Sequence, residues 1–141
     1  MSDLIHLVYT SKAVCPMNSD DFLRLLIPAR EKNHRLHITG MLLYQKQNFL
    51  QVLEGREMAV EKLFKSIIQD GRHENVTLLI KHPVTDREYA EWDLKFINLD
   101  TLNLSKIRGH NAYTKVAIDS RSLEMGNFTH TFLSIFRDLK L

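Results

Sequence analysis

The order of strand-like and helix-like segments constrains the fold of this chain more than any other feature. Residues 4–11 are rich in β-branched and aromatic side chains and predict a strand. Residues 18–33 then carry capping side chains followed by apolar residues at helical spacing. Residues 38–55 contain two apolar runs with a polar break at 45–48, which is typical of a β-hairpin.

The chain continues with a second helix and two more strands. Residues 56–70 have an apolar stripe opposite charged side chains and predict an amphipathic helix. Two further strands are predicted at about 76–84 and 91–99. The pattern then weakens until Asn127, which can cap a final helix that reaches Leu139.

This order predicts an α+β fold, a ferredoxin-like βαββαββ mixed sheet with two helices on one face, plus a C-terminal helical extension. We expect one domain at residues 1–99 and an extension at 100–141 that packs on the sheet. From the right-handed crossover rule we expect the first and third strands to be neighbours and parallel.

Composition excludes several classes of partner. The chain has 141 residues, and 19 Lys+Arg against 17 Asp+Glu leave a net charge of +2 without a basic run. Nucleic-acid binding is therefore not expected. No segment approaches the roughly 20 apolar residues of a membrane span, and the N-terminus does not resemble a signal peptide. We therefore expect a cytoplasmic protein that does not bind membranes.

Two polar side chains break the apolar pattern of the predicted sheet. Alternation places Tyr9 on the face of Ile5 and Leu7, and places Gln51 between Phe49 and Leu53 on one face of another strand. Buried polar groups need hydrogen-bond partners, since leaving one unsatisfied costs on the order of 1–3 kcal/mol. Either the two side chains bond each other, or they hold the polar edge of a ligand between the helices.

Three separated motifs follow an initial strand that contains LVYTS. They are AREKNHRLHITGMLLY at 29–44, NFLQVLEG at 48–55 and DGRHENV at 70–76. In this order they resemble the BLUF family of blue-light sensors that use flavin, and the resemblance runs from about Leu4 to Leu99. It implies that residues 1–99 form a sensor domain that binds FAD non-covalently. The sequence does not choose between FAD and other flavins.

The resemblance also implies a mechanism. Tyr9 and Gln51 match the tyrosine and glutamine that hydrogen-bond near the flavin N5 and O4 edge. Light would drive proton-coupled electron transfer from Tyr9, and rearrangement of Gln51 would switch a hydrogen-bond network. The chain would then be a photoreceptor without enzymatic activity that signals to an unidentified partner protein. Whether it forms a homo-oligomer stays open.

Further positions match the family pocket. Trp92 matches a photochemically relevant tryptophan on the fifth strand, and Leu94 stands where most members carry methionine, so a tryptophan–methionine exchange is excluded as the signal. Ala29 replaces a common serine. The expected cofactor-binding residues are Leu25, Ala29, Lys32, Asn33, Phe49, Gln51, Leu53, Ile67, Asp70, Arg72, His73 and Leu94.

Two other functions stay open from the residues alone. Arg72 and Asn33 could serve a small ferredoxin-like hydrolase of acyl phosphates or phosphoesters. Alternatively, the chain could be an interaction module without flavin, in which Tyr9 and Gln51 only satisfy each other. We expect no metal site, because His34 and His37 have no third ligand nearby in the sequence.

Overall fold

The computed structural model describes residues 3–101 of the chain. This part forms two helices and five strands: β1 (Leu4–Ala13), α1 (Ser19–Arg35), β2 (Thr39–Gln45), β3 (Asn48–Arg56), α2 (Glu57–Ile68), β4 (His73–Pro83) and β5 (Lys95–Asn98). The predicted ferredoxin-like α+β fold is confirmed. The helix expected from Asn127 lies outside the described residues, as does the extension apart from residues 100 and 101. In the described part, neither helix is long and apolar enough to cross a membrane.

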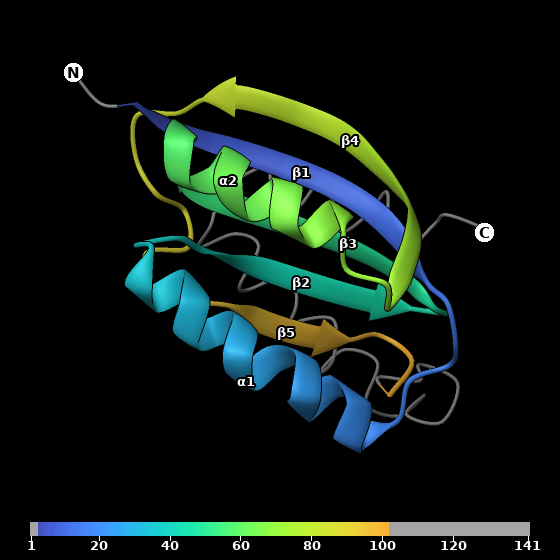
Figure 1. The fold of residues 1–141 in the computed structure, drawn as a ribbon. Helices are drawn as coiled ribbons and strands as arrows, with labels where there is room; N and C mark the ends of the chain where they lie inside the picture. Colours follow the sequence, from blue (N-terminus) through green and yellow to red (C-terminus); the bar gives the residue numbers. More distant parts are fainter. Residues whose placement is uncertain (1–2, 102–141) are drawn as a thin grey trace, which may run out of the picture. The chain divides into compact units, whose positions relative to one another are not determined.

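The five strands form one sheet in the order β4-β1-β3-β2-β5, and both helices lie on one face of it (Figure 1). The expectation of a parallel β1–β3 pair was wrong, because β3 is antiparallel to both of its neighbours, β1 and β2. The crossover rule applies to β1 and β2, which α1 connects. Strand β3 returns from β2 through a hairpin and inserts between them, so it must run the opposite way.

Helix α1 begins with a capping box. The side chain of Asn18 accepts a hydrogen bond from the Asp21 backbone N–H at 2.9 Å, and the Asp21 carboxylate accepts one from the Asn18 N–H, also at 2.9 Å. This arrangement satisfies two backbone donors that the first turn leaves unpaired. The helix then continues through Pro28 to Arg35.

The hairpin between β2 and β3 places its strands very close together. Lys46 and Gln47 form the turn with positive φ values of 48° and 67°, the left-handed conformation of a two-residue hairpin turn. At Gly40, an added Cβ would lie 1.9 Å from the carbonyl oxygen of Val52, so only glycine fits. The hairpin thereby holds β2 in register with Gln51.

Each helix covers its own apolar cluster. Helix α2 packs Val60 and Leu63 against Ile5 and Leu7 of β1. The cluster under α1 combines residues of the helix with residues of β2, β3 and the segment that enters β5: Phe22, Leu26, Leu42, Tyr44, Phe49 and Leu94. The central strands therefore lie under the space between the two helices.

Candidate functional site

Tyr9 and Gln51 lie next to each other on the central strands. They are direct partners in the β1–β3 register, and the Tyr9 hydroxyl donates a hydrogen bond to Gln51 Oε1. Leu42 of β2 stands opposite Gln51 on the other side. Because Oε1 faces the tyrosine, the amide nitrogen of Gln51 points away from it. The pair proposed from the alternation pattern is therefore present, whether or not it also holds a ligand.

The surroundings of Tyr9 keep its hydroxyl protonated. Only 3% of the residue is exposed, and its ring lies 5.3 Å from the Phe64 ring and 6.4 Å from the His73 ring, measured between centroids. Burial raises the pKa of Tyr9 well above its usual value, and the negative charge of Asp70 raises it further. Tyr9 is thus a neutral hydrogen-bond donor over the whole physiological pH range.

The raised pKa of Tyr9 predicts how stability depends on pH. A tyrosine in the unfolded chain ionises at a pKa of about 10, whereas the folded protein holds the proton more tightly. The contribution of protonated Tyr9 to the free energy of unfolding is complete below about pH 10 and is lost as the pH rises toward the pKa of Tyr9 in the folded protein. We expect the free energy of unfolding to fall more steeply above pH 10 in the wild type than in Tyr9→Phe. Urea unfolding at several pH values measures this difference, and equal slopes would contradict it.

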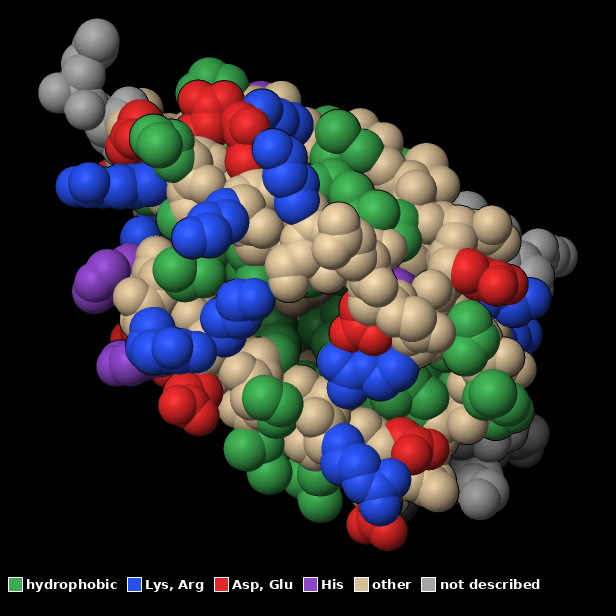
Figure 2. Space-filling view, viewed as in Figure 1, with side chains coloured by type: hydrophobic (Ala, Val, Ile, Leu, Met, Phe, Trp, Pro, Cys, Tyr) green, Lys and Arg blue, Asp and Glu red, His purple; other side chains and the backbone are tan. Residues whose placement is uncertain are grey.

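A cavity of about 220 Å³ opens beside this pair, between the two helices. Figure 2 shows the hollow in the middle of this face, with hydrophobic side chains inside it and charged side chains at its edge. Leu25 and Ala29 line it from α1, and Leu63 and Ile67 line it from α2. Two apolar walls with a carboxamide between them suit a planar aromatic ring that has a polar edge.

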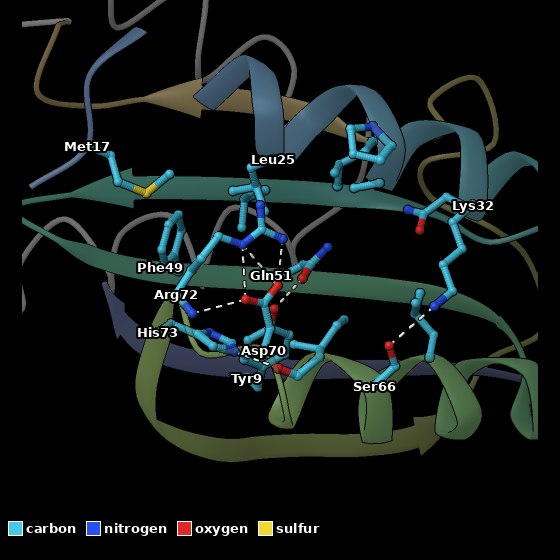
Figure 3. Close-up of a pocket in the computed structure, with 17 residues that line it drawn as sticks. Tyr9, Met17, Leu25, Lys32, Phe49, Gln51, Ser66, Asp70, Arg72 and His73 are labelled. Carbon is cyan, nitrogen blue, oxygen red and sulfur yellow. Dashed lines mark hydrogen bonds and ion pairs between the residues drawn. The ribbon is translucent and has the colours of Figure 1, made fainter. Parts of the chain in front are cut away.

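An ion pair stands at one side of the cavity (Figure 3). The Arg72 guanidinium binds both oxygens of the Asp70 carboxylate, with Nε 3.0 Å from Oδ1 and Nη2 2.6 Å from Oδ2. Hydrogen bonds from Arg72 lower the pKa of Asp70, so its negative charge persists beside Tyr9 at neutral pH. His73 is within hydrogen-bonding distance of Ser11 Oγ, at 2.8 Å, and of the Ile67 carbonyl, at 2.6 Å.

Polar contacts also tie α1 to its surroundings near the cavity. Lys32 Nζ donates to Ser66 Oγ of α2 at 3.2 Å, across the space between the helices (Figure 3). The buried Asn33 donates from Nδ2 to the backbone carbonyl of Asp93 at 2.7 Å. Its amide therefore fixes the segment that leads into β5, in addition to lining the cavity.

The structure brings most of the expected residues together. The cavity lining includes these members of the expected set: Tyr9, Leu25, Ala29, Lys32, Asn33, Phe49, Gln51, Ile67, Asp70, Arg72, His73 and Leu94. Leu53 does not line the cavity, because it is fully buried in the cluster under α2. Trp92 is also outside the lining and lies in the loop before β5, since that strand begins at Lys95 rather than at residue 91.

Five lining residues were not expected from the sequence: Met17, Pro28, Leu42, Leu63 and Ser66. Pro28 follows Leu25 by three positions, and Leu63 precedes Ile67 by four, so both share a helical face with an expected residue. Helical spacing could therefore have identified them. Met17 lies between β1 and α1 and has no such signal.

The hydrolase alternative is not supported. Arg72 is bound to the Asp70 carboxylate, and Asn33 donates its amide to a backbone carbonyl, so neither is arranged as a phosphate ligand. Within residues 3–101, no group of three or more His, Cys, Asp or Glu side chains is placed to hold a metal ion.

Comparison with known proteins gives one consistent family. Residues 4–95 match the BLUF family, described as sensors of blue light using FAD. Subunit beta of the photoactivated adenylate cyclase of Euglena longa is 40% identical over 94 residues, which are 66% of this chain and 11% of that protein. The chain thus spans about a tenth of the length of this relative.

Solved structures agree with this family. The dark-state structure of BlrB, a BLUF protein, is 28% identical and superposes with a TM-score of 0.66 over 80% of this chain and 92% of that one. Klebsiella pneumoniae BlrP1, in a structure with FMN and cyclic diGMP, is also 28% identical, with a TM-score of 0.64 over 83% of this chain and 35% of that chain.

Proposed function

This chain belongs to the BLUF family of blue-light sensors, whose members bind a flavin, and from this premise we propose that Tyr9 and Gln51 are its switch. The observation that carries the proposal is the Tyr9–Gln51 hydrogen bond beside an apolar cavity between two helices. It joins an oxidisable phenol to a side chain that can reverse its hydrogen-bonding direction.

The cavity residues suit a flavin ring. Leu25 and Ala29 would lie against one face of the ring, and Leu63 and Ile67 against the other. The amide nitrogen of Gln51 points away from Tyr9 and would donate to a polar ring edge. Arg72 and Asp70 would stand beside the ring, where their ion pair keeps the local charge balanced.

When bound, the flavin supplies absorption of blue light and a strong oxidant in its excited state. Tyr9 would give an electron to the excited flavin and its hydroxyl proton to Gln51 Oε1, to which this hydroxyl already donates a hydrogen bond. Gln51 would take that proton and rotate or change tautomer, so that the end that was an acceptor becomes a donor, and the return of an electron and a proton to Tyr9 would leave no net oxidation. The new hydrogen-bond pattern is the lit state, and it reverses in the dark.

We propose FAD as the cofactor, on the ground of the family description. A related structure contains FMN, so FAD is not the only flavin to be considered. In this chain Lys32 lines the cavity and carries a positive charge, which suits the phosphate groups of either nucleotide. All three natural flavins are therefore used in the test below.

We further propose that the output is non-covalent contact with a partner protein. The similarity to the Euglena cyclase subunit covers only 11% of that protein, so its cyclase activity is not carried over. The signal would leave through Leu94 and the loop at Trp92 toward β5 and the extension at 100–141. The sensor domain at 1–99, the cytoplasmic location and the photochemical role of Trp92 stay predictions.

The proposal is tested by the absorption spectrum of the purified protein. We expect a yellow protein with bound flavin and a small, reversible red shift of its band under blue light. Protein that purifies without flavin is mixed with FAD, FMN or riboflavin, and each mixture is separated by gel filtration before measurement. A protein that retains none of the three would overturn the proposed function.

A further inference from the structure

Glu54 is a fully buried carboxylate on the strand that carries Gln51. The two are three positions apart, so alternation points Glu54 to the face of β3 opposite the cavity. Its carboxylate has four hydrogen-bond partners. Oε2 is 2.8 Å from His6 Nε2 and from the Glu88 N–H nitrogen, and Oε1 is 2.7 Å from Thr39 Oγ1 and from the Tyr89 N–H nitrogen.

Two of these partners are consecutive backbone amides of one loop. By holding the N–H groups of Glu88 and Tyr89, Glu54 fixes the middle of the segment between β4 and β5. Arg87 strengthens this attachment, because its guanidinium donates to Thr39 Oγ1 at 2.8 Å and to the His37 carbonyl at 2.7 Å. We call residues 87–94 the connecting segment.

The other end of the connecting segment belongs to the cavity. Its residues 93 and 94 offer their backbone carbonyls to α1, where Asn33 and Arg30 donate to them at 2.7 Å and 2.9 Å. The buried side chain of Leu94 then forms part of the cavity wall. A short, hydrogen-bonded run of chain thus leads from the Glu54 carboxylate to the wall of the cavity that Gln51 also lines.

We propose that Glu54 is a positioning residue for the light switch, which sets the place of Leu94 and so controls how fast Gln51 returns from its lit arrangement. This inference rests on the proposed function of the cavity. Glu54 acts through backbone hydrogen bonds and does not touch the cavity itself. A loosened connecting segment gives Gln51 more room to rotate, so the dark state is restored faster.

The charge of Glu54 is maintained by its surroundings. Burial alone would raise its pKa, but the hydrogen bonds from His6, Thr39 and the two loop amides outweigh burial and lower it. The side chain is therefore a carboxylate with both oxygens available as acceptors. A glutamine in its place offers one oxygen, so in either orientation of the amide one of the two loop N–H groups loses its acceptor.

Glu54→Gln is the first test, with Glu61→Gln as its control. Glu61 is a carboxylate on α2 that pairs with Lys81 away from the connecting segment. In Glu54→Gln we expect amide exchange at Glu88 and Tyr89 to accelerate about tenfold or more, measured by NMR or mass spectrometry. We also expect dark recovery of the flavin spectrum to accelerate about threefold or more, whereas Glu61→Gln behaves as the wild type.

If Glu54→Gln does not fold, Thr39→Val and Thr39→Ser replace it, because valine removes the hydroxyl that bonds Glu54 and serine keeps it. We then expect faster amide exchange and faster dark recovery in Thr39→Val, and wild-type behaviour in Thr39→Ser. If Glu54→Gln, or Thr39→Val in its place, binds flavin and recovers in the dark at the wild-type rate, the positioning role is overturned. The proposed function would not be affected by that result. If the wild type binds no flavin, the proposed function is overturned and this inference with it. Amide exchange needs no flavin, so unchanged exchange at Glu88 and Tyr89 in the variant would overturn the attachment to Glu54 in that case too.

Discussion

Tyr9→Phe is expected to abolish the light-induced red shift while the flavin stays bound. Phenylalanine keeps the ring that packs against Phe64, so the wall of the cavity is preserved. It lacks the hydroxyl that donates to Gln51 Oε1, and with it the proton that has to leave with the electron. The light-minus-dark absorption difference measures the effect, which we expect to fall to less than about a tenth of the wild-type amplitude.

Tyr44→Phe is the matched control for this prediction. Tyr44 is equally buried, on β2, but it packs against Phe22 and Phe49 and does not line the cavity. It should keep a full red shift. A normal shift in Tyr9→Phe would mean that another residue supplies the electron and the proton, and the switch proposed for Tyr9 would have to be abandoned.

Gln51→Leu is expected to be equally inactive, for a different reason. Leucine has a similar volume and keeps the central strand apolar, so the helices and the cavity walls should remain in place. Tyr9 can still be oxidised in this variant, but its hydroxyl has lost the acceptor and no side chain can reverse its hydrogen bonds. We therefore expect bound flavin, an unshifted band in the light and a loss of stability of about 1–3 kcal/mol.

Gln69→Leu is the control for Gln51→Leu. Gln69 is an exposed glutamine at the C-terminal end of α2, outside the cavity lining. The red shift of Gln69→Leu should match that of the wild type. Spectra in the dark and under blue light, together with urea unfolding, separate a missing switch from a missing fold. A red shift of full size in Gln51→Leu would remove the carboxamide from the mechanism.

Several features of the fold followed directly from residue patterns. Polar side chains on strand faces shared with apolar residues identified Tyr9 and Gln51 as exceptional positions, and the register places them opposite each other. The helical stripes identified the faces that line the cavity. Strand direction was misjudged because the crossover rule was applied to β1 and β3 instead of β1 and β2. The start of β5 was misjudged because alternation does not separate a strand from a loop such as the one that contains Trp92.

The hydrogen-bond partners of Glu54 could not be predicted from residue patterns. A carboxylate within the apolar run NFLQVLEG indicates that it needs a buried partner, but nothing in the local sequence says which one. Its four partners come from three places that are far apart in the chain: His6, Thr39, and the neighbouring residues Glu88 and Tyr89. Only the folded sheet brings them within hydrogen-bonding distance.

Side-chain periodicity was sufficient to identify the apolar faces, the order of the elements and the polar pair, because these depend on neighbours within a few residues. The antiparallel placement of β3, the burial of Leu53 away from the cavity and the attachment of residues 87–94 depended on contacts between distant segments. Such contacts are selected by the packing and hydrogen bonding of the whole domain, and no short stretch of the chain contains that information.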